Sequence, residues 1–156
     1  MQVTTSITGT EEIVKRLRLL PERLGRNAIR RSLRKGANVI RDQARTNARQ
    51  LDDNLSREAI FKNIVTQGMG RKRERQAGGV GMRVGVLGGA RAGQDGSSNP
   101  GGDTFYWRFL EFGTSQMAAR PFMRNAMSSS AEKAISTTIE AMKTETAKEL
   151  TKMGVR

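Results

Sequence analysis

Six of the seven aromatic side chains in this chain lie within residues 105–122, FYWRFLEFGTSQMAARPF. Large aromatic side chains each bury about 150–250 Å², so most domains distribute them through the core. Here one segment holds nearly all of them, together with the carboxylate of Glu111 and a glycine turn at Gly113-Thr114. We therefore expect this segment to form the centre of the molecule.

The remaining composition predicts a thin core. The chain has 156 residues, which is the length of one domain, so residues 1–156 are expected to fold as a single unit. Only 36% of the residues are hydrophobic, against a usual apolar share of about 45–50% that includes glycine. A core this thin favours a protein whose neighbouring subunits supply part of the burial.

The chain is strongly basic, with a formal net charge of +13. The first fifty residues alone carry twelve basic and four acidic side chains. Such a balance favours an anionic partner, which could be nucleic acid, an acidic protein surface or a membrane headgroup layer. A solvated helix face is the alternative explanation for each individual lysine or arginine.

Several classes of chemistry are excluded or disfavoured by missing residue types. The chain has no cysteine, which excludes disulfides and thiolate sites, and no histidine, the commonest general base and metal ligand. We therefore expect no metal and no cofactor. No apolar run approaches the ~20 residues of a membrane span, and the first residues lack the pattern of a signal peptide. A soluble intracellular product without a membrane partner is expected.

The first half of the chain has the periodicity of two consecutive helices. Thr10, Glu11 and Glu12 have the residue types of a helix start, and Pro21 breaks or restarts the helix. Beyond Pro21 the apolar positions recur at spacings of three to five: Leu24, Ala28 or Ile29, Leu33, Ala37, Ile40, Ala44 and Ala48. This pattern predicts one long helix, and Gly36 on it predicts a close approach by whatever packs there.

The middle of the chain has the pattern of short strands and long loops. Residues 59–66 favour a strand over a helix, and the alternation in residues 80–87 predicts a half-buried strand. Between them, residues 68–79 contain the charge run RKRER flanked by glycines, which is typical of a mobile loop or a hairpin tip. Residues 88–103 have the composition of a flexible loop or arm.

The last third predicts a second long helix. Residues 105–112 could form a strand or a short helix, and Pro121 has the position of a helix opening. Glutamates and lysines between residues 132 and 152, Glu145 and Glu149 among them, predict a mixed-sign solvent face for that helix. The order predicts an α+β fold in which a long N-terminal helix and a C-terminal helix pack on a small antiparallel sheet, with long Gly-rich loops.

Few residues have the pattern of a catalytic site. Asp52 and Asp53 are adjacent, so their side chains point apart and a turn or cap is preferred to a paired acid site. Glu111 lies among apolar residues, where an acid is either a general base with a raised pKa or is paired with an arginine. The candidate partners are Arg108, Arg120 or an arginine of a neighbouring subunit. Pairing is favoured because no nucleophile or second acid accompanies Glu111, so we expect no enzyme.

The aromatic segment also carries a motif. Its residues are Tyr106, Glu111-Phe112-Gly113-Thr114, Met117 and Ala119-Arg120-Pro121-Phe122-Met123-Arg124-Asn125-Ala126. They resemble the signature of the neck and tail-completion, or head–tail joining, proteins of long-tailed bacteriophages, of the lambdoid tail-component type. The first half is also similar, at Leu17, Leu20, Leu24 and residues 36–40. Three departures are Trp107, where an alanine usually follows the tyrosine, residues 47–55, which lack the usual Ala-Pro, and the long loop at residues 88–103.

The resemblance implies a structural virion protein that forms a ring at the head–tail junction, joins the connector to the tail tube and lets DNA pass. It implies a homo-oligomer, with six copies expected and twelve as the alternative, beside connector or head-closure proteins and tail-terminator or tail-tube proteins. Viral DNA in the lumen is a further expected partner. The protein would be in the virion neck or tail, and in the host cytoplasm during assembly. A basic nucleic-acid-binding protein without a virion role is the alternative.

Two groups of residues are candidates for interaction and assembly, and none is a catalytic candidate. The first group is Glu111, Phe112, Gly113, Thr114, Arg120, Pro121 and Phe122; the second is Arg71, Lys72, Arg73 and Arg75. Gly113 is expected to adopt a positive φ in the turn. Residues 68–79 and 88–103 are expected to be mobile in the isolated protein and ordered only against a partner ring or DNA.

Overall fold

The computed structural model describes residues 10–51, 58–87 and 99–154. Helix α1 spans Thr10–Leu19 and helix α2 spans Glu22–Arg49, so the break predicted at Pro21 is confirmed. The carbonyl oxygen of Pro21 accepts hydrogen bonds from the backbone N–H groups of Leu24 and Gly25, which starts α2 without a side-chain cap. Every helix within the described ranges is too short or too polar to span a membrane.

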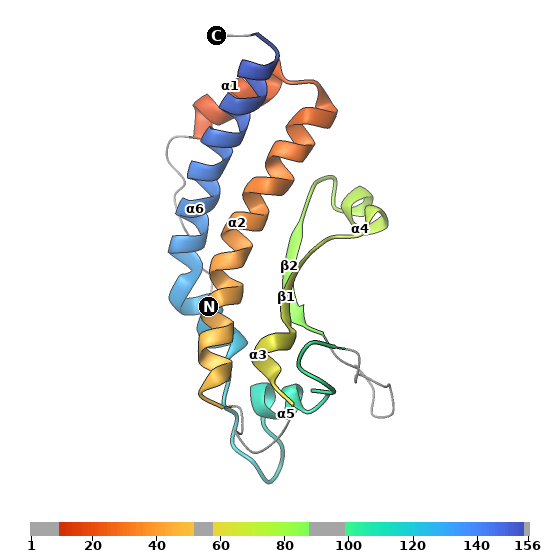
Figure 1. Cartoon of the computed structure of the whole chain (residues 1–156), viewed down its shortest axis with the longest axis vertical. Coiled ribbons are helices and arrows are strands. Elements are labelled where there is room, and N and C mark those ends of the chain that lie inside the picture. The colour runs from red at the N-terminus through yellow and green to blue at the C-terminus, as the bar shows by residue number, and fades with distance from the viewer. Residues whose placement is uncertain (1–9, 52–57, 88–98, 155–156) are drawn as a thin grey trace.

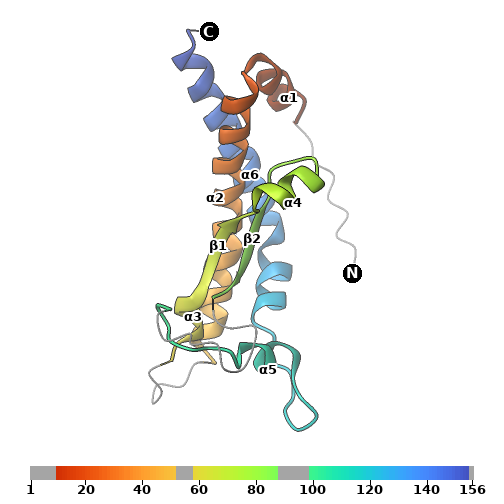
Figure 2. The same cartoon turned by 90° about the vertical axis from the view of Figure 1, so that its right-hand side faces the viewer.

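The body of the molecule is an antiparallel pair of long helices (Figures 1 and 2). Helix α6, Met123–Lys152, runs beside α2 for most of its length. The predicted close approach at Gly36 is confirmed, because a Cβ built there would lie 1.9 Å from the Thr138 Oγ1 atom and 2.7 Å from the Ala134 carbonyl oxygen. Glycine at this position allows the backbones of α2 and α6 to approach each other closely.

A two-stranded antiparallel sheet packs against α2, on the side away from α6 in Figure 1. Strand β1, Ile64–Gly68, pairs with strand β2, Met82–Val86, with Ile64 opposite Val86 and Gly68 opposite Met82. The predicted strand at 80–87 is confirmed. The arrangement of two long helices and a small antiparallel sheet is α+β, as expected.

Three segments of the middle region differ from the expectation. Residues 59–66 divide into a short helix α3, Ile60–Asn63, followed by β1, because the backbone N–H of Ala59 and the side chain of Asn63 bond to residues 101–104 instead of continuing a strand. The RKRER run lies at the hairpin tip but forms a helix, α4, Arg71–Gln76. Residues 99–103 are held against α3, whereas residues 88–98 of the predicted arm lie outside the described ranges.

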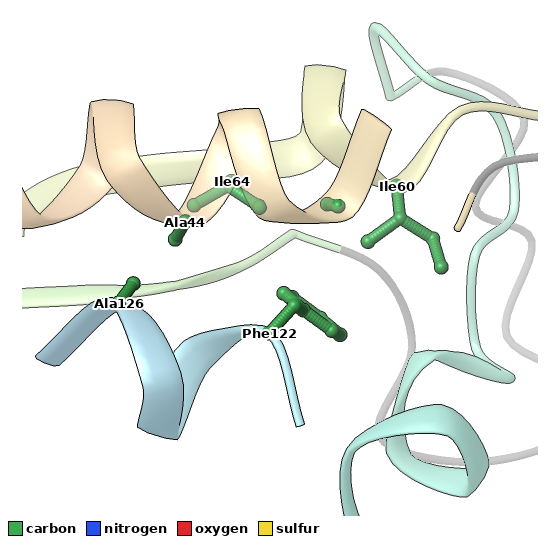
Figure 3. Packing of buried hydrophobic residues seen from close by; sticks show 6 residues of the cluster. Ala44, Ile60, Ile64, Phe122 and Ala126 are labelled. Carbon is green, nitrogen blue, oxygen red and sulfur yellow. The ribbon is translucent and has the colours of Figure 1, made fainter. Parts of the chain in front are cut away.

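The hydrophobic core lies where α2, α3, β1 and the start of α6 meet (Figure 3). Its fully buried members are Ala44, Ala48, Ile60, Ile64, Phe122 and Ala126. The aromatic segment therefore does not form the centre of the molecule. Phe122 is buried and Tyr106 and Trp107 pack against the cluster, but other aromatic side chains of the segment remain exposed. Small side chains occupy the α2–α6 contact, which leaves no room for rings between the helices.

The acidic residues near the end of α6 do not form the predicted solvent face. Glu145 and Glu149 are buried and bind basic side chains of α2: the Arg31 Nε atom lies 2.7 Å from a Glu145 carboxylate oxygen and the Lys35 Nζ atom 3.0 Å from the other. The hydrogen bonds from Lys35 and then Arg31 lower the pKa of Glu145, and the bond from Arg31 lowers the pKa of Glu149. Charge pairing thus links α2 and α6 near the end of α6.

Candidate assembly site

The carboxylate of Glu111 caps the N-terminus of α6. Helix α5, Trp107–Phe112, carries Glu111, whose side chain is only 2% exposed. Its Oε2 atom accepts hydrogen bonds from the backbone N–H groups of Phe122 and Met123 at 2.8 and 2.9 Å, and its Oε1 atom accepts one from Arg124 at 3.0 Å. A helix start has unpaired N–H groups and a partial positive charge, so a buried carboxylate is stable there.

The arginine that pairs with Glu111 is Arg124 of α6 rather than Arg108 or Arg120. The Arg124 Nε atom donates to the Glu111 Oε1 atom at 3.2 Å, and its Nη2 atom donates to the Glu111 carbonyl oxygen. The guanidinium also lies 5.4 Å from the centre of the Phe112 ring. Glu111 is therefore paired with an arginine, as expected. That arginine belongs to α6, because the turn after α5 brings the start of α6 back over α5.

The turn between α5 and α6 depends on glycine. Gly113 has φ +75° and ψ 178°, a conformation nearly restricted to glycine, so its predicted positive φ is confirmed. A Cβ at this position would lie 2.9 Å from both the Met117 carbonyl oxygen and the Ala119 nitrogen. The Thr114 hydroxyl accepts hydrogen bonds from the N–H groups of Gln116 and Met117, which closes the tip of the turn.

The segment from Arg120 to Phe122 completes this junction. The Arg120 N–H donates to the Leu110 carbonyl oxygen at 2.7 Å, and the Phe122 carbonyl oxygen accepts from the Asn47 side chain of α2 at 3.1 Å. Pro121 directly precedes the cap residue Phe122. The first group of candidate residues is thus brought together around one junction of α5, α6 and α2.

Four apolar side chains of α5 and its flanks face solvent. Phe105, Phe109, Phe112 and Met117 are 39%, 49%, 64% and 37% exposed, and we call this group the aromatic surface. Helix α5 lies at one end of the molecule (Figures 1 and 2). Phe105 and Phe109 meet edge to face with ring centres 6.4 Å apart. Clustered exposed rings of this kind are typical of protein–protein contacts.

A separate apolar hollow of about 540 Å³ lies along the two long helices, and we call it the α2–α6 groove. Its lining is mainly apolar and comes from α2, α6, the first residue of α1 and residues 80–82 at the start of β2. The larger or more apolar members are Leu33, Ala37, Ile40, Val80, Met82, Met127, Ala131, Ile135, Ile139 and Met142. The groove shares no residue with the aromatic surface. The part of the chain that the structure describes therefore includes two distinct apolar surfaces.

The second group of candidates lies elsewhere. Arg71, Lys72, Arg73 and Arg75 are all exposed on α4, at the hairpin tip and away from α5 (Figure 1). Sequence reasoning missed Glu74 between them, which is 4% exposed and binds Arg30 of α2 at 3.0 and 3.1 Å. The charge run is anchored to the body by this ionic contact.

Asn63 is a second residue that sequence reasoning missed. Its side chain donates to the Gly102 carbonyl oxygen and to the Thr104 hydroxyl at 2.9 and 2.8 Å, and accepts from the Gly101 N–H at 2.7 Å. Asn63 and Thr104 are fully buried. The one sequence signal for this role was a single asparagine within an apolar run, because a buried amide side chain needs hydrogen-bond partners.

The candidate site, within the residues that the structure describes, has no arrangement typical of catalysis. Glu111 is occupied by backbone N–H groups and Arg124, and no cluster of three potential metal ligands occurs among the residues that the structure describes. Asp52 and Asp53 lie outside the described ranges. The junction can cap a helix and support a surface, which are the properties of an assembly element.

Comparison with known families gives one match. Residues 11–113 match the family described as "Bacteriophage HK97-gp10, putative tail-component". The match covers most of the chain, so the protein belongs to this family of phage tail components, and the resemblance is confirmed. It includes Glu111, Phe112 and Gly113 but ends before α6. Searches of curated proteins and of solved structures found no match.

Membership gives the chain a structural role in a bacteriophage and associates it with the tail region of the virion. The description of the family names a tail component and no catalytic activity.

Proposed function

We propose that the protein is a ring-forming subunit at the head–tail junction, which joins the connector to the tail tube and leaves a channel for DNA. The observation that carries this proposal is the presence of two different exposed apolar surfaces on one chain. A surface that binds a different surface of an identical copy makes a head-to-tail contact, and such contacts form a ring when the rotation between successive copies closes the circle. The aromatic surface and the α2–α6 groove are suited to be those two surfaces.

The thin core agrees with this role. The contact of α2 and α6 uses small and charged side chains, so little apolar area is buried within one copy. Insertion of Phe109 and Phe112 into a neighbouring groove would remove large ring surfaces from water, at about 25 cal/mol per Å². Six copies are the expected number and twelve the alternative. The partners above and below would be head-closure or connector proteins and tail-terminator or tail-tube proteins.

Removal of the gene from the phage tests the role. We expect unjoined heads and tails to accumulate, and labelled antibody to mark the neck of particles rescued by the wild-type protein. Rescue by Lys133→Gln, an exposed position on α6, would be a matched control for variants of the assembly site. Normal joined particles without the protein would contradict the proposal.

A basic nucleic-acid-binding protein without a virion role is a second candidate, favoured by the net charge of +13. Purified particles separate the two proposals. The second candidate predicts a monomer or dimer that binds DNA and is absent from virions, whereas a ring subunit is present in a fixed number of copies.

A further inference from the structure

Two adjoining hollows lie where α4 meets the N-terminal half of α2. One, of about 470 Å³, is lined by Arg26, Arg30, Arg71, Glu74 and Arg75, and the other, of about 350 Å³, by Glu22, Arg23, Arg26, Asn27 and Arg30. They share Arg26 and Arg30, so they adjoin at these two side chains. We call the five arginines that line the two hollows, Arg23, Arg26, Arg30, Arg71 and Arg75, the arginine basin.

We propose that the arginine basin binds the phosphate backbone of double-stranded nucleic acid without reading its sequence. The first reason is uncompensated charge: five guanidinium groups face two carboxylates, those of Glu22 and Glu74. Within the described ranges no carboxylate lies within ion-pair distance of Arg23, Arg71 or Arg75. Their charge is available to an external anion.

The second reason is that the basin is held in place. Buried Glu74 accepts two hydrogen bonds from Arg30 and lies 3.6 Å from an Arg26 nitrogen. These contacts fix α4 against α2 and orient two guanidiniums at the floor. Each guanidinium has five N–H donors, so most remain for a ligand. A basin arranged before binding loses less side-chain entropy when a ligand binds.

The third reason is the chemistry of the lining, which selects among anions. All lining side chains are arginine, glutamate or asparagine, and none is apolar. Protein interfaces have an apolar or aromatic centre, and proteins that bind single strands present aromatic rings for stacking. The basin has neither. Guanidinium forks match phosphate oxygens, so a duplex backbone is the polyanion that fits.

The spacing suits an extended backbone. Arg23, Arg26 and Arg30 follow one another at intervals of three and four residues on α2, which places them on one face over about 10 Å. Arg71 and Arg75 form a second row on α4, four residues apart. Two rows with a hollow between them can contact successive phosphates. The inference rests on the proposed function for its setting, since a subunit around a DNA channel needs a surface that attracts the duplex.

Binding of a fluorescent random-sequence duplex, followed by anisotropy over a series of KCl concentrations, tests the inference. The test variant is Arg71→Gln with Arg75→Gln, and the control is Lys133→Gln with Lys143→Gln, which removes equal charge from exposed positions of α6. The basin variant should bind about tenfold more weakly, with the slope of log K against log salt reduced by about two. The control should change affinity less than about twofold. Circular dichroism checks that both variants fold.

Four outcomes of the binding experiment would overturn the inference. An equal loss of DNA affinity in the basin and control variants would mean that net charge alone drives binding. Absence of DNA binding by the wild-type protein would show that the basin is not a DNA site. Displacement of the duplex by polyglutamate at matched charge would assign the basin to acidic proteins, and preference for single strands would exclude the duplex. If the basin variant alone loses DNA binding but the protein is absent from virions, only the proposed function fails. If the protein is present in virions but the basin and control variants bind DNA equally, only this inference fails.

Discussion

Arg124 binds Glu111 through both its backbone and its side chain. Its N–H and Nε groups donate to the Glu111 Oε1 atom, and its Nη2 group donates to the Glu111 carbonyl oxygen. Glu111 of α5 thereby caps α6, and Arg124 of α6 in turn binds Glu111. The aromatic surface on α5 is consequently fixed to the α2–α6 body rather than carried by an independent loop.

Replacement of Glu111 should be among the most destabilising single changes in the chain. Glu111→Ala leaves the N–H groups of Phe122 and Met123 without their acceptor, and we expect a loss of about 3 kcal/mol in the free energy of unfolding. Arg124→Ala keeps the cap and should cost about 1 kcal/mol, since the guanidinium is largely exposed. Urea denaturation measures both. Equal costs would show that the ion pair, and not the cap, holds the junction.

Gly113→Val should destabilise the turn between α5 and α6. Strain at this φ and ψ costs about 1–3 kcal/mol, and the added Cβ would also lie too close to the Met117 carbonyl oxygen. Gly79→Ala is the control, because a Cβ there meets no atom within 4 Å and the φ is ordinary. Thermal unfolding compares the two. If the Gly113 variant matched the control, the turn would have a different conformation in solution.

Two glycines of α2 should respond to alanine in opposite directions. Gly36→Ala places a Cβ against Thr138 and the Ala134 carbonyl and should cost more than about 1 kcal/mol. At Gly25 the nearest atoms would be 3.8 and 3.9 Å away, so Gly25→Ala should stabilise the protein by about 0.5–1 kcal/mol through helix propensity. Urea denaturation gives both signs, and stabilisation by both would mean that α2 and α6 are further apart than described.

Stability should fall with acid in a way that depends on Glu145. The pKa of Glu145 is lowered in the folded protein, so its contribution is complete above the ordinary carboxyl value of about 4.3 and is lost as the pH falls below that value. Glu145→Gln should flatten the dependence of the melting temperature on pH between about 3 and 6. Glu140→Gln, an exposed position on the same helix, should leave it unchanged. Identical slopes for the two variants would contradict the buried pairing.

The parts that sequence predicts well are those set by local patterns. The continuous apolar spacing of α2, the break at Pro21 and the positive φ of Gly113 all follow from properties of nearby residues. The wrong expectations concern distant partners. A helix in which glutamates alternate with lysines has the same sequence pattern whether the glutamates face water or bind basic residues of another helix. Glu145 belongs to the second case, because it binds Arg31 and Lys35 of α2.

The candidate site shows the same division. Its residues are adjacent in sequence and were found together, but the partner of Glu111 depended on how the turn folds back. The contacts of Glu74 with Arg30 and of Asn63 with Thr104 span 44 and 41 residues, and no periodicity indicates them. The exposure of Phe109 and Phe112 could not be predicted either. An amino-acid sequence shows how many aromatic rings a segment has, but it does not show which face of a short helix packs against the rest of the molecule.

A photo-crosslink from the aromatic surface in assembled particles tests the ring proposal most directly. With p-benzoylphenylalanine at position 112, we predict crosslinks to groove residues of another copy, such as Met127 or Met142, because benzophenone reacts readily with methionine. Gel electrophoresis should show a ladder of multimers that ends at the ring number. The same probe at position 133, on the exposed face of α6, is the control. Crosslinks from position 112 only within one copy, or only to a different protein, would contradict head-to-tail packing of identical subunits.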